Sequence, residues 1–315
     1  MRPSRRWIAR EIERLDPDRD YAAIWRLTSS YGLNEFSLNL VYAHLLPHFY
    51  VPSHGADTVW DEGDGKVMQR ATQRVEDTVR NNLIWWFYGP SHQKTRTSVE
   101  NINRLHAFHA RKRPGAFAHQ EDYVYALAFS AASLHRFFHK LGLPGYTAKQ
   151  KVAAHRFWQE MGALFVDEAG DPIMDFPEDW DALIAFLEEF ESRPWPAHGN
   201  GAIVTAAVMD QFAFRFFPAP LHWLARAIVA STYHPTCWRV HSVPVPSAPL
   251  RAVLLRAVGA GIRLQRAVLP DARRAYQEDL EALSREDRAG RARAIRTLDD
   301  EFAAFFRRRH GLAAR

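Results

Sequence analysis

Residues 146–165 read YTAKQKVAAHRFWQEMGALF, and this stretch shows the pattern that decides the fold class. Thr147 stands where a helix-capping residue is expected, and apolar side chains, among them Phe157, Trp158 and Met161, follow at helical spacing. Residues 179–192, DWDALIAFLEEFES, show the same periodicity as an amphipathic helix. Both segments predict helices, which points to an all-α protein.

The same helical pattern recurs over most of the remaining chain. Loops are expected at residues 51–65, at 194–201 and across the proline-rich residues 234–249, where WRVHSVPV gives a weak strand pattern. No break is strong enough to indicate a second domain, so we predict a single all-α helical bundle over residues 1–315. Further helices are expected at residues 4–15, 20–31, 33–48, 66–88, 95–111, 120–141, 201–232 with a break at FPAP, and from about 249 to the end.

Composition narrows the class of protein. With 315 residues, 47% of them apolar, the chain can bury a sizeable core, and its ten Trp and twenty Phe could also wall an apolar pocket. The one cysteine, Cys237, excludes an intramolecular disulfide and a cysteine-cluster metal site. The N-terminus is charged throughout, and no uncharged run reaches the length of a membrane span. We therefore expect a cytoplasmic protein.

The net charge of +5 comes largely from arginine clusters near the C-terminus, RAGRARAIRTLDD (288–300) and FFRRRHGLAAR (305–315). Acidic residues are interspersed among these arginines, which is typical of a solvated helix surface. We therefore expect no nucleic-acid partner. The arginines and phenylalanines of this region are also compatible with peripheral contact to anionic lipid head groups.

Several site motifs are absent from the sequence. It has no G-x-G-x-x-G opening a βαβ unit, no P-loop and no G-x-S-x-G nucleophile elbow. None of the fifteen histidines follows an Asp or Glu by three residues, which excludes the Glu-x-x-His motif of di-iron helical bundles. His135 and His139 have the i, i+4 spacing of a zinc pair, but they lack a following glutamate and a third ligand.

Two stretches hold candidate site residues. In NRLHAFHARKR (103–113), His106 and His109 lie three residues apart and therefore share a helix face. They could be core residues, metal ligands or haem ligands. In QRATQRVEDTVRNNLIWWFYGP (69–90), Arg74 and Thr78 lie four apart ahead of an aromatic run. Spacing alone leaves open whether these two belong to a charged surface face or lie beside a haem.

Three segments in order resemble the family that includes the bacterial latex-clearing proteins (rubber oxygenases) and the fungal oxygenase that shortens the prenyl chain in mycophenolic acid biosynthesis. They are QRVEDTVRNNLIWWFYGP (73–90), TRTSVENINRLHAFHAR (95–111) and the stretch from QEDYVYAL to QEMG (120–162). VPS (51–53) and FPAPLHWLAR (217–226) also look like family landmarks. The resemblance covers roughly residues 40–270, and the ordered set rather than any single motif carries it.

This resemblance implies an all-α, globin-like core around haem b. It implies that His106 is the proximal ligand of the haem iron and that Arg74 and Thr78 are distal residues. The implied reaction is the dioxygen-dependent cleavage of a carbon–carbon double bond in an isoprenoid, giving two carbonyl products. The expected partners are therefore a hydrophobic small molecule and dioxygen.

The sequence departs from rubber oxygenases at two positions. Asp77 stands where those enzymes have a lysine before the distal threonine, and Asn103 stands where they have an arginine three residues before the ligand histidine. Glu62 is the candidate for their upstream catalytic glutamate. These departures point to a different distal chemistry and to a substrate other than rubber, with Asp77 or Glu62 as the general base.

Three further residues are expected near the cofactor, and other functions remain open. His109 is expected to orient a haem propionate or the backbone, and the hydroxyl groups of Tyr123 and Tyr125 are expected to reach the pocket. One alternative is a haem monooxygenase or oxidase acting on a small secondary metabolite. Another is a haem-free helical protein that stores a lipid.

Overall fold

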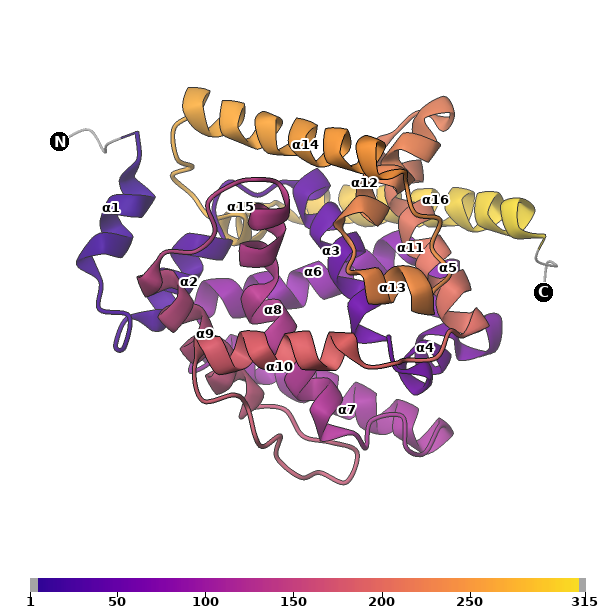
Figure 1. The fold of residues 1–315 in the computed structure, drawn as a ribbon, viewed down its shortest axis with the longest axis horizontal. Coiled ribbons are helices and arrows are strands. Elements are labelled where there is room, and N and C mark those ends of the chain that lie inside the picture. Colours follow the sequence, from indigo (N-terminus) through magenta and orange to yellow (C-terminus); the bar gives the residue numbers. More distant parts are fainter. Residues whose placement is uncertain (1–4, 312–315) are drawn as a thin grey trace. The chain divides into compact units, whose positions relative to one another are not determined.

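The structure is a computed structural model that describes residues 5–311, and its helices are shown in Figure 1. Within this part of the chain there is no β-strand, only two isolated bridges, Tyr31–Ala275 and Val166–Pro172. The predicted all-α class is confirmed. In chain order the helices are α1 (Trp7–Arg14), α2 (Tyr21–Ser29), α3 (Glu35–Phe49), α4 (Ser53–Trp60), η1 (Asp61–Gly63), α5 (Lys66–Gln69), α6 (Ala71–Tyr88), α7 (Gln93–Lys112), α8 (Gln120–Lys140), α9 (Ala148–Gly162), α10 (Trp180–Ser192), α11 (Gly199–Phe216), η2 (Ala219–Leu221), α12 (His222–Thr232), α13 (Pro235–Val240), α14 (Ala248–Val268), α15 (Tyr276–Ala282) and α16 (Arg285–His310).

The chain separates into two compact units, each built from three segments. Unit 1 consists of Met1–Leu33, Asn81–Arg193 and Leu255–Asp279, and unit 2 consists of Asn34–Arg80, Pro194–Leu254 and Leu280–Arg315. Helices α6 and α14 each begin in unit 2 and end in unit 1. Neither unit is therefore a continuous stretch of sequence, and the single domain stays a prediction.

Unit 1 is organised around α8 and α9, which pack on each other and on α2 and α10. The predicted cap of α9 is confirmed: the Thr147 hydroxyl accepts from the Gln150 backbone N–H, and the Gln150 side chain accepts from the Thr147 backbone N–H. This reciprocal pairing satisfies two of the N–H groups that a helix start leaves without partners. It fixes where α9 begins.

A buried ion pair joins α8 to α10 in unit 1. Arg136 donates through both terminal nitrogens to the Glu191 carboxylate, with Nη1 at 2.8 Å from Oε1. The Tyr125 hydroxyl, expected near the cofactor pocket, also donates to Oε1 of Glu191, at 3.3 Å. Glu191 is 3% exposed, so these three hydrogen bonds replace the water that its charge has lost.

Unit 2 is organised around α11, which packs against α3, α4, α5, α12 and α16. Its buried side chains point in all directions around the helix, as a fully enclosed helix requires. Pro47 lies inside α3, where it cannot donate to the Ala43 carbonyl. The buried Tyr233 hydroxyl donates to that carbonyl instead, at 2.9 Å, so the missing backbone bond is replaced.

Three local predictions were wrong. Residues 51–65 are not a loop, since α4 occupies Ser53–Trp60, and it packs on α11. The helix expected over 66–88 is broken at Arg70, whose φ of −140° separates α5 from α6. The proline-rich stretch after residue 233 holds α13 rather than a strand: Pro235 takes the first helical position, and the His234 ring accepts from the Thr236 N–H.

The long helices are not membrane spans. Among residues 5–311, none of the helices combines the length and the apolar character needed to cross a bilayer. The C-terminal α16 belongs to unit 2, where its Phe302 and Phe306 are 0% and 1% exposed. These two phenylalanines are therefore core residues of unit 2.

Candidate functional site

The proximal candidates come from two helices of unit 1. His106 lies on α7 and Tyr123 lies in the first turn of α8, and the structure brings them together. Nδ1 of His106 lies 3.3 Å from the Tyr123 hydroxyl oxygen. The half-buried His106 ring also stacks on Phe117, with centroids 4.3 Å apart and planes 18° from parallel. Two contacts from outside α7 therefore set the orientation of this imidazole.

The protonation of Tyr123 decides what it offers to His106. Burial, followed by the negative charges of Asp167, Glu168 and Asp122, raises the pKa of Tyr123. The phenol therefore keeps its proton at neutral pH. Its oxygen can accept from Nδ1–H of His106, and in that tautomer Nε2 carries the lone pair that a metal requires.

Glu168 holds the segment that positions Phe117 against His106. Its two carboxylate oxygens accept from the backbone N–H groups of Gly115 and Phe117, at 2.9 and 3.0 Å, and its own N–H donates to the Phe117 carbonyl at 3.1 Å. The neighbouring Asp167 accepts from the Gln120 side chain of α8. That bond, above all, lowers the pKa of Asp167. The loop after α9 thus fastens the connection between α7 and α8.

Replacing Glu168 by alanine is expected to loosen this connection. The change removes two charge-assisted hydrogen bonds and should lower the free energy of unfolding by about 1–3 kcal/mol. Amide hydrogen exchange at Gly115 and Phe117 should speed up, while Glu100→Ala on the exposed part of α7 should leave both amides unchanged. Unchanged exchange in Glu168→Ala would show that the carboxylate does not hold the segment.

Asn103 and His109 lie on the same helix with different surroundings. The Asn103 amide donates through Nδ2 to the Leu164 carbonyl at 3.0 Å. Its Oδ1 is buried and has no hydrogen-bond partner within the part of the chain that the structure describes. This atom is an acceptor, so it suits water or another donor rather than an ionised propionate. The His109 ring lies edge-on to Phe108, with centroids 5.5 Å apart.

The distal candidates lie at the start of α6, in unit 2. Arg74 donates through Nη1 to Thr78 Oγ1, and the Thr78 hydroxyl donates to the Arg74 carbonyl at 3.0 Å. Both side chains are half-buried. The predicted pair is therefore in direct contact, and a guanidinium charge is held beside a hydroxyl group.

Tyr42 of α3 adds a hydroxyl group that sequence reasoning missed. The side chain is 4% exposed, and its OH has no hydrogen-bond partner among the described residues. Burial raises the pKa of Tyr42 to about 12, although the positive charge of Arg74 acts in the opposite direction. A buried hydroxyl without a partner is destabilising, typically by about 1–3 kcal/mol, and such groups often have a functional reason.

Asp77, the third candidate on α6, forms ion pairs with basic side chains. It is paired with Lys66 and Arg80, and it accepts from the Gln73 side chain at 2.7 Å. Burial favours the neutral acid, but the bonds from Lys66 and Gln73 and the positive charges outweigh it and lower the pKa of Asp77. A carboxylate stabilised as the anion is a weak general base.

Glu62 lies away from any regular helix turn. It is exposed and sits in η1, where Asp61, Glu62 and Gly63 have φ values of 45°, 55° and 93°. Such left-handed conformations are unfavourable for residues other than glycine. The sequence placed this glutamate in a loop, and the structure places it in a tight, conformationally restricted turn.

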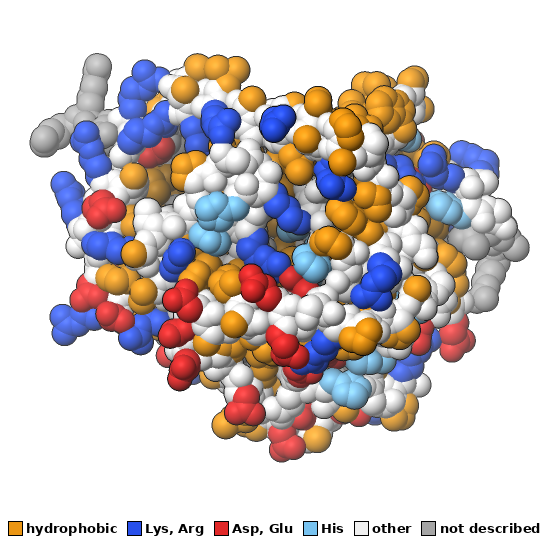
Figure 2. Space-filling view, viewed as in Figure 1, with side chains coloured by type: hydrophobic (Ala, Val, Ile, Leu, Met, Phe, Trp, Pro, Cys, Tyr) orange, Lys and Arg blue, Asp and Glu red, His pale blue; other side chains and the backbone are white. Residues whose placement is uncertain are grey.

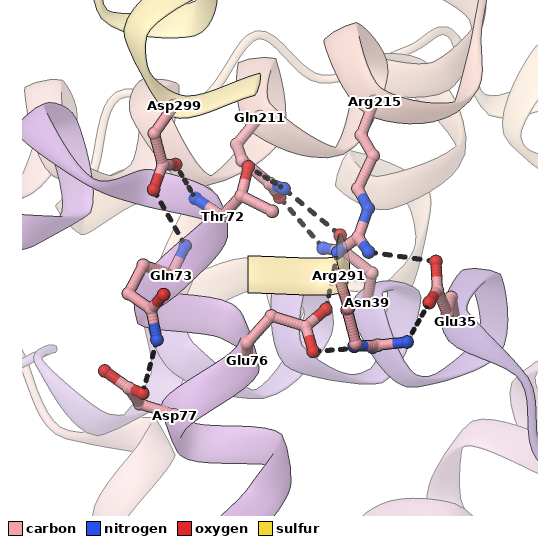
Figure 3. A network of polar contacts seen from close by, with 10 residues as sticks. All are labelled: Glu35, Asn39, Thr72, Gln73, Glu76, Asp77, Gln211, Arg215, Arg291 and Asp299. Carbon is pink, nitrogen blue, oxygen red and sulfur yellow. Dashed lines mark hydrogen bonds and ion pairs between the residues drawn. The ribbon is translucent and has the colours of Figure 1, made fainter. Parts of the chain in front are cut away.

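The start of α6 is held by a network of polar contacts within unit 2, drawn in Figure 3. The buried Asp299 of α16 accepts from the backbone N–H groups of Thr72 and Gln73, at 2.6 and 3.2 Å, and so caps α6. Glu76 is paired with Arg215 at 3.0 Å and with Arg291 at 2.7 Å, and both arginines also bind Glu35. Helices α3, α11 and α16 thereby fix the helix that carries Arg74 and Thr78.

Within residues 5–311, no group of three or more His, Cys, Asp and Glu side chains could hold a metal ion. In the His135–His139 pair, Nδ1 of His135 accepts from the Tyr146 N–H at 2.8 Å, which is a structural role. Haem makes a smaller demand, because the porphyrin supplies the in-plane ligands and the protein needs one axial side chain. His106 fits that demand, since Nδ1 has a partner that fixes the ring.

Comparison with known proteins adds no family assignment. Neither the protein-family models nor the curated proteins include a match to this chain.

Proposed function

We propose that the protein is a haem b-dependent oxygenase that acts on a hydrophobic substrate, with oxidative cleavage of a carbon–carbon double bond by dioxygen as its reaction. The observation that carries the proposal is His106, with Nδ1 held by Tyr123 and the ring stacked on Phe117. The resemblance of residues 73–90, 95–111 and 120–162 to latex-clearing proteins supports the same residue as the axial ligand.

Bound through His106, haem would supply one-electron and dioxygen chemistry. Tyr123 would accept a hydrogen bond from Nδ1–H of His106 and keep the ring in one tautomer. The distal role falls to Arg74 and Thr78, as the resemblance implies. A cation held beside a hydroxyl group is suited to stabilising negative charge that develops on a reacting oxygen.

The low pKa of Asp77 bears on the proton transfers. Asp77 is held as an anion by Lys66 and Arg80. It therefore neutralises these two cations rather than taking up a proton. A protonated, buried Tyr42 near the charge of Arg74 is better suited to donate a hydrogen bond. In the proposed enzyme, Tyr42 therefore joins Arg74 and Thr78 as a polar group.

The test is a visible spectrum of the purified protein before and after reduction, followed by carbon monoxide. A Soret band that shifts on reduction, and again with carbon monoxide, is expected if haem is bound with a position open to gas ligands. A colourless protein that also fails to take up added haem would contradict the proposal and favour a haem-free lipid-binding protein. With unsaturated lipids and dioxygen, two carbonyl fragments are expected, whereas a single inserted oxygen would indicate a monooxygenase.

A further inference from the structure

Helix α14 presents an exposed face without a polar side chain. At 100° per residue, the positions on this face, counted over residues 253–268, fall within about 60° of the direction of Leu264. The three large ones, Val253, Leu264 and Val268, are 60%, 66% and 56% exposed. All members of the face are exposed, and they are Val253, Ala257, Ala260, Gly261, Leu264, Ala267 and Val268.

The opposite side of α14 anchors the helix within unit 1. Gly259 is buried, and a Cβ atom there would lie 2.3 Å from the Leu141 carbonyl oxygen, so the helix backbone lies directly on the end of α8. Arg263 donates to the Gly142 carbonyl, and Arg266 lies over the Phe138 ring at 4.8 Å. The core contacts of this part of α14 are made on that side, and the apolar face points away from them.

The charged side chains of α14 are all basic. They are the arginines at positions 251, 256, 263 and 266, of which 251 and 266 lie on the side opposite the apolar face. Arg256 is exposed and borders the apolar face. At the end of the helix, Arg5 and Arg6 donate to the carbonyls of Val268 and Leu269, where cations also complement the helix dipole, and Arg6 is paired with Asp271 at 3.3 Å. Leu269, itself 52% exposed, extends the apolar surface.

We propose that this face of α14 docks on an anionic lipid surface. Exposed aliphatic side chains bordered by arginines are the features of a helix that lies in a membrane interface, with its apolar face among the acyl chains and its cations at the head groups. Figure 2 shows apolar and basic side chains next to one another along the edge where α14 lies in Figure 1. The proposal does not depend on the haem.

Charge argues against a second copy of the chain as the occupant of this face. A second copy packed on it would bring two sets of arginines together without an acidic residue on either helix. The other arginine-rich helix, α16, is less suited to lipid, because Phe302 and Phe306 are buried in unit 2. Anionic lipid head groups, in contrast, neutralise the arginines without any protein carboxylate.

Co-sedimentation of the full chain with vesicles tests the proposal, with vesicles of phosphatidylcholine alone and of phosphatidylcholine mixed with phosphatidylserine. Binding is expected only to the mixed vesicles and should weaken as salt is added. Arg256→Gln should weaken binding about fivefold, the effect of one cation near the membrane surface. The double variant Leu264→Gln, Val268→Gln should weaken it about tenfold or more, because it removes the apolar contact with the acyl chains.

Two control variants make the same kinds of substitution, Arg to Gln and apolar to Gln, at exposed positions outside α14. Arg308→Gln removes the same charge from α16, and Met174→Gln removes an apolar side chain that is 60% exposed. Both should bind like the unchanged protein. Absence of binding to the mixed vesicles, or an equal loss in Arg308→Gln, would overturn the proposal. A dimer in light scattering that the Leu264→Gln, Val268→Gln variant dissociates would overturn it in favour of a second copy.

Discussion

Replacing His106 by alanine is expected to abolish the Soret band of the purified protein. If His106 is the axial ligand, no other side chain can replace its nitrogen at the same place, because Tyr123 and Phe117 position this ring and no other. The measurement is a haem titration of the purified variant, followed by its visible spectrum. His106 is half-buried, so the variant should keep its helical circular dichroism, which separates loss of the ligand from loss of the fold.

Two further variants make this experiment discriminating. His109→Ala, three residues along α7, should bind haem like the unchanged protein, since its ring lies against Phe108. Tyr123→Phe should keep haem but weaken its binding about 10–100-fold, which is the usual effect of losing the hydrogen bond behind a metal-bound histidine. Full haem content in His106→Ala, with loss in His109→Ala, would move the axial role to His109 and remove the basis of the proposed site.

Local signals were sufficient for the helices of unit 1. Thr147 and Gln150 cap α9 through bonds between residues three apart, so the start of this helix could be predicted. The break at Arg70 could not, because the cap of α6 comes from Asp299, more than two hundred residues along the chain. The helix α4 was missed since its glycine and aspartate residues favour a loop, and packing against α11 outweighs that preference.

The same limit applies to the candidate site. Contacts between residues of one helix could be predicted from the sequence, whereas contacts between distant segments could not. The contact between Arg74 and Thr78 follows from i, i+4 spacing on one helix. The partners of His106 do not, since Tyr123 belongs to the next helix and Phe117 is held by Glu168, about fifty residues further on. The sequence did not indicate a site role for Tyr42, because a tyrosine in an apolar helix is normally predicted to be a core residue. Only the structure shows that its hydroxyl group lacks a hydrogen-bond partner among the described residues.

The buried His241 is expected to make the free energy of unfolding of unit 2 depend on pH. This residue is 1% exposed and follows α13. Its Nε2–H donates to the Pro47 carbonyl at 2.8 Å, at the end of α3. Its Nδ1 is buried without a hydrogen-bond partner among the described residues, and the His198 ring lies 5.5 Å away. A proton added at Nδ1 would therefore place a charge in a buried site that offers it no hydrogen-bond acceptor among the described residues.

Unfolding should consequently become easier as the pH falls from about 6.5 towards 4. Burial, together with the charge of His198 and despite the bond to Pro47, lowers the pKa of His241 from 6.5 to about 4. Between these values the unfolded chain binds a proton at this residue that the folded chain excludes, so the free energy of unfolding rises with pH. The full effect is roughly 3 kcal/mol, from the size of the pKa shift.

Urea unfolding at a series of pH values from 4 to 7 would measure this effect. The variant His241→Gln keeps an N–H donor for the Pro47 carbonyl and cannot titrate, so its stability should change less with pH over this window than that of the unchanged protein. His119→Gln, at an exposed histidine, should leave the pH dependence as it is. Equal slopes for the unchanged protein and His241→Gln would mean that the ring does not stay neutral, and that unit 2 opens enough to admit water to the contact between His241 and Pro47.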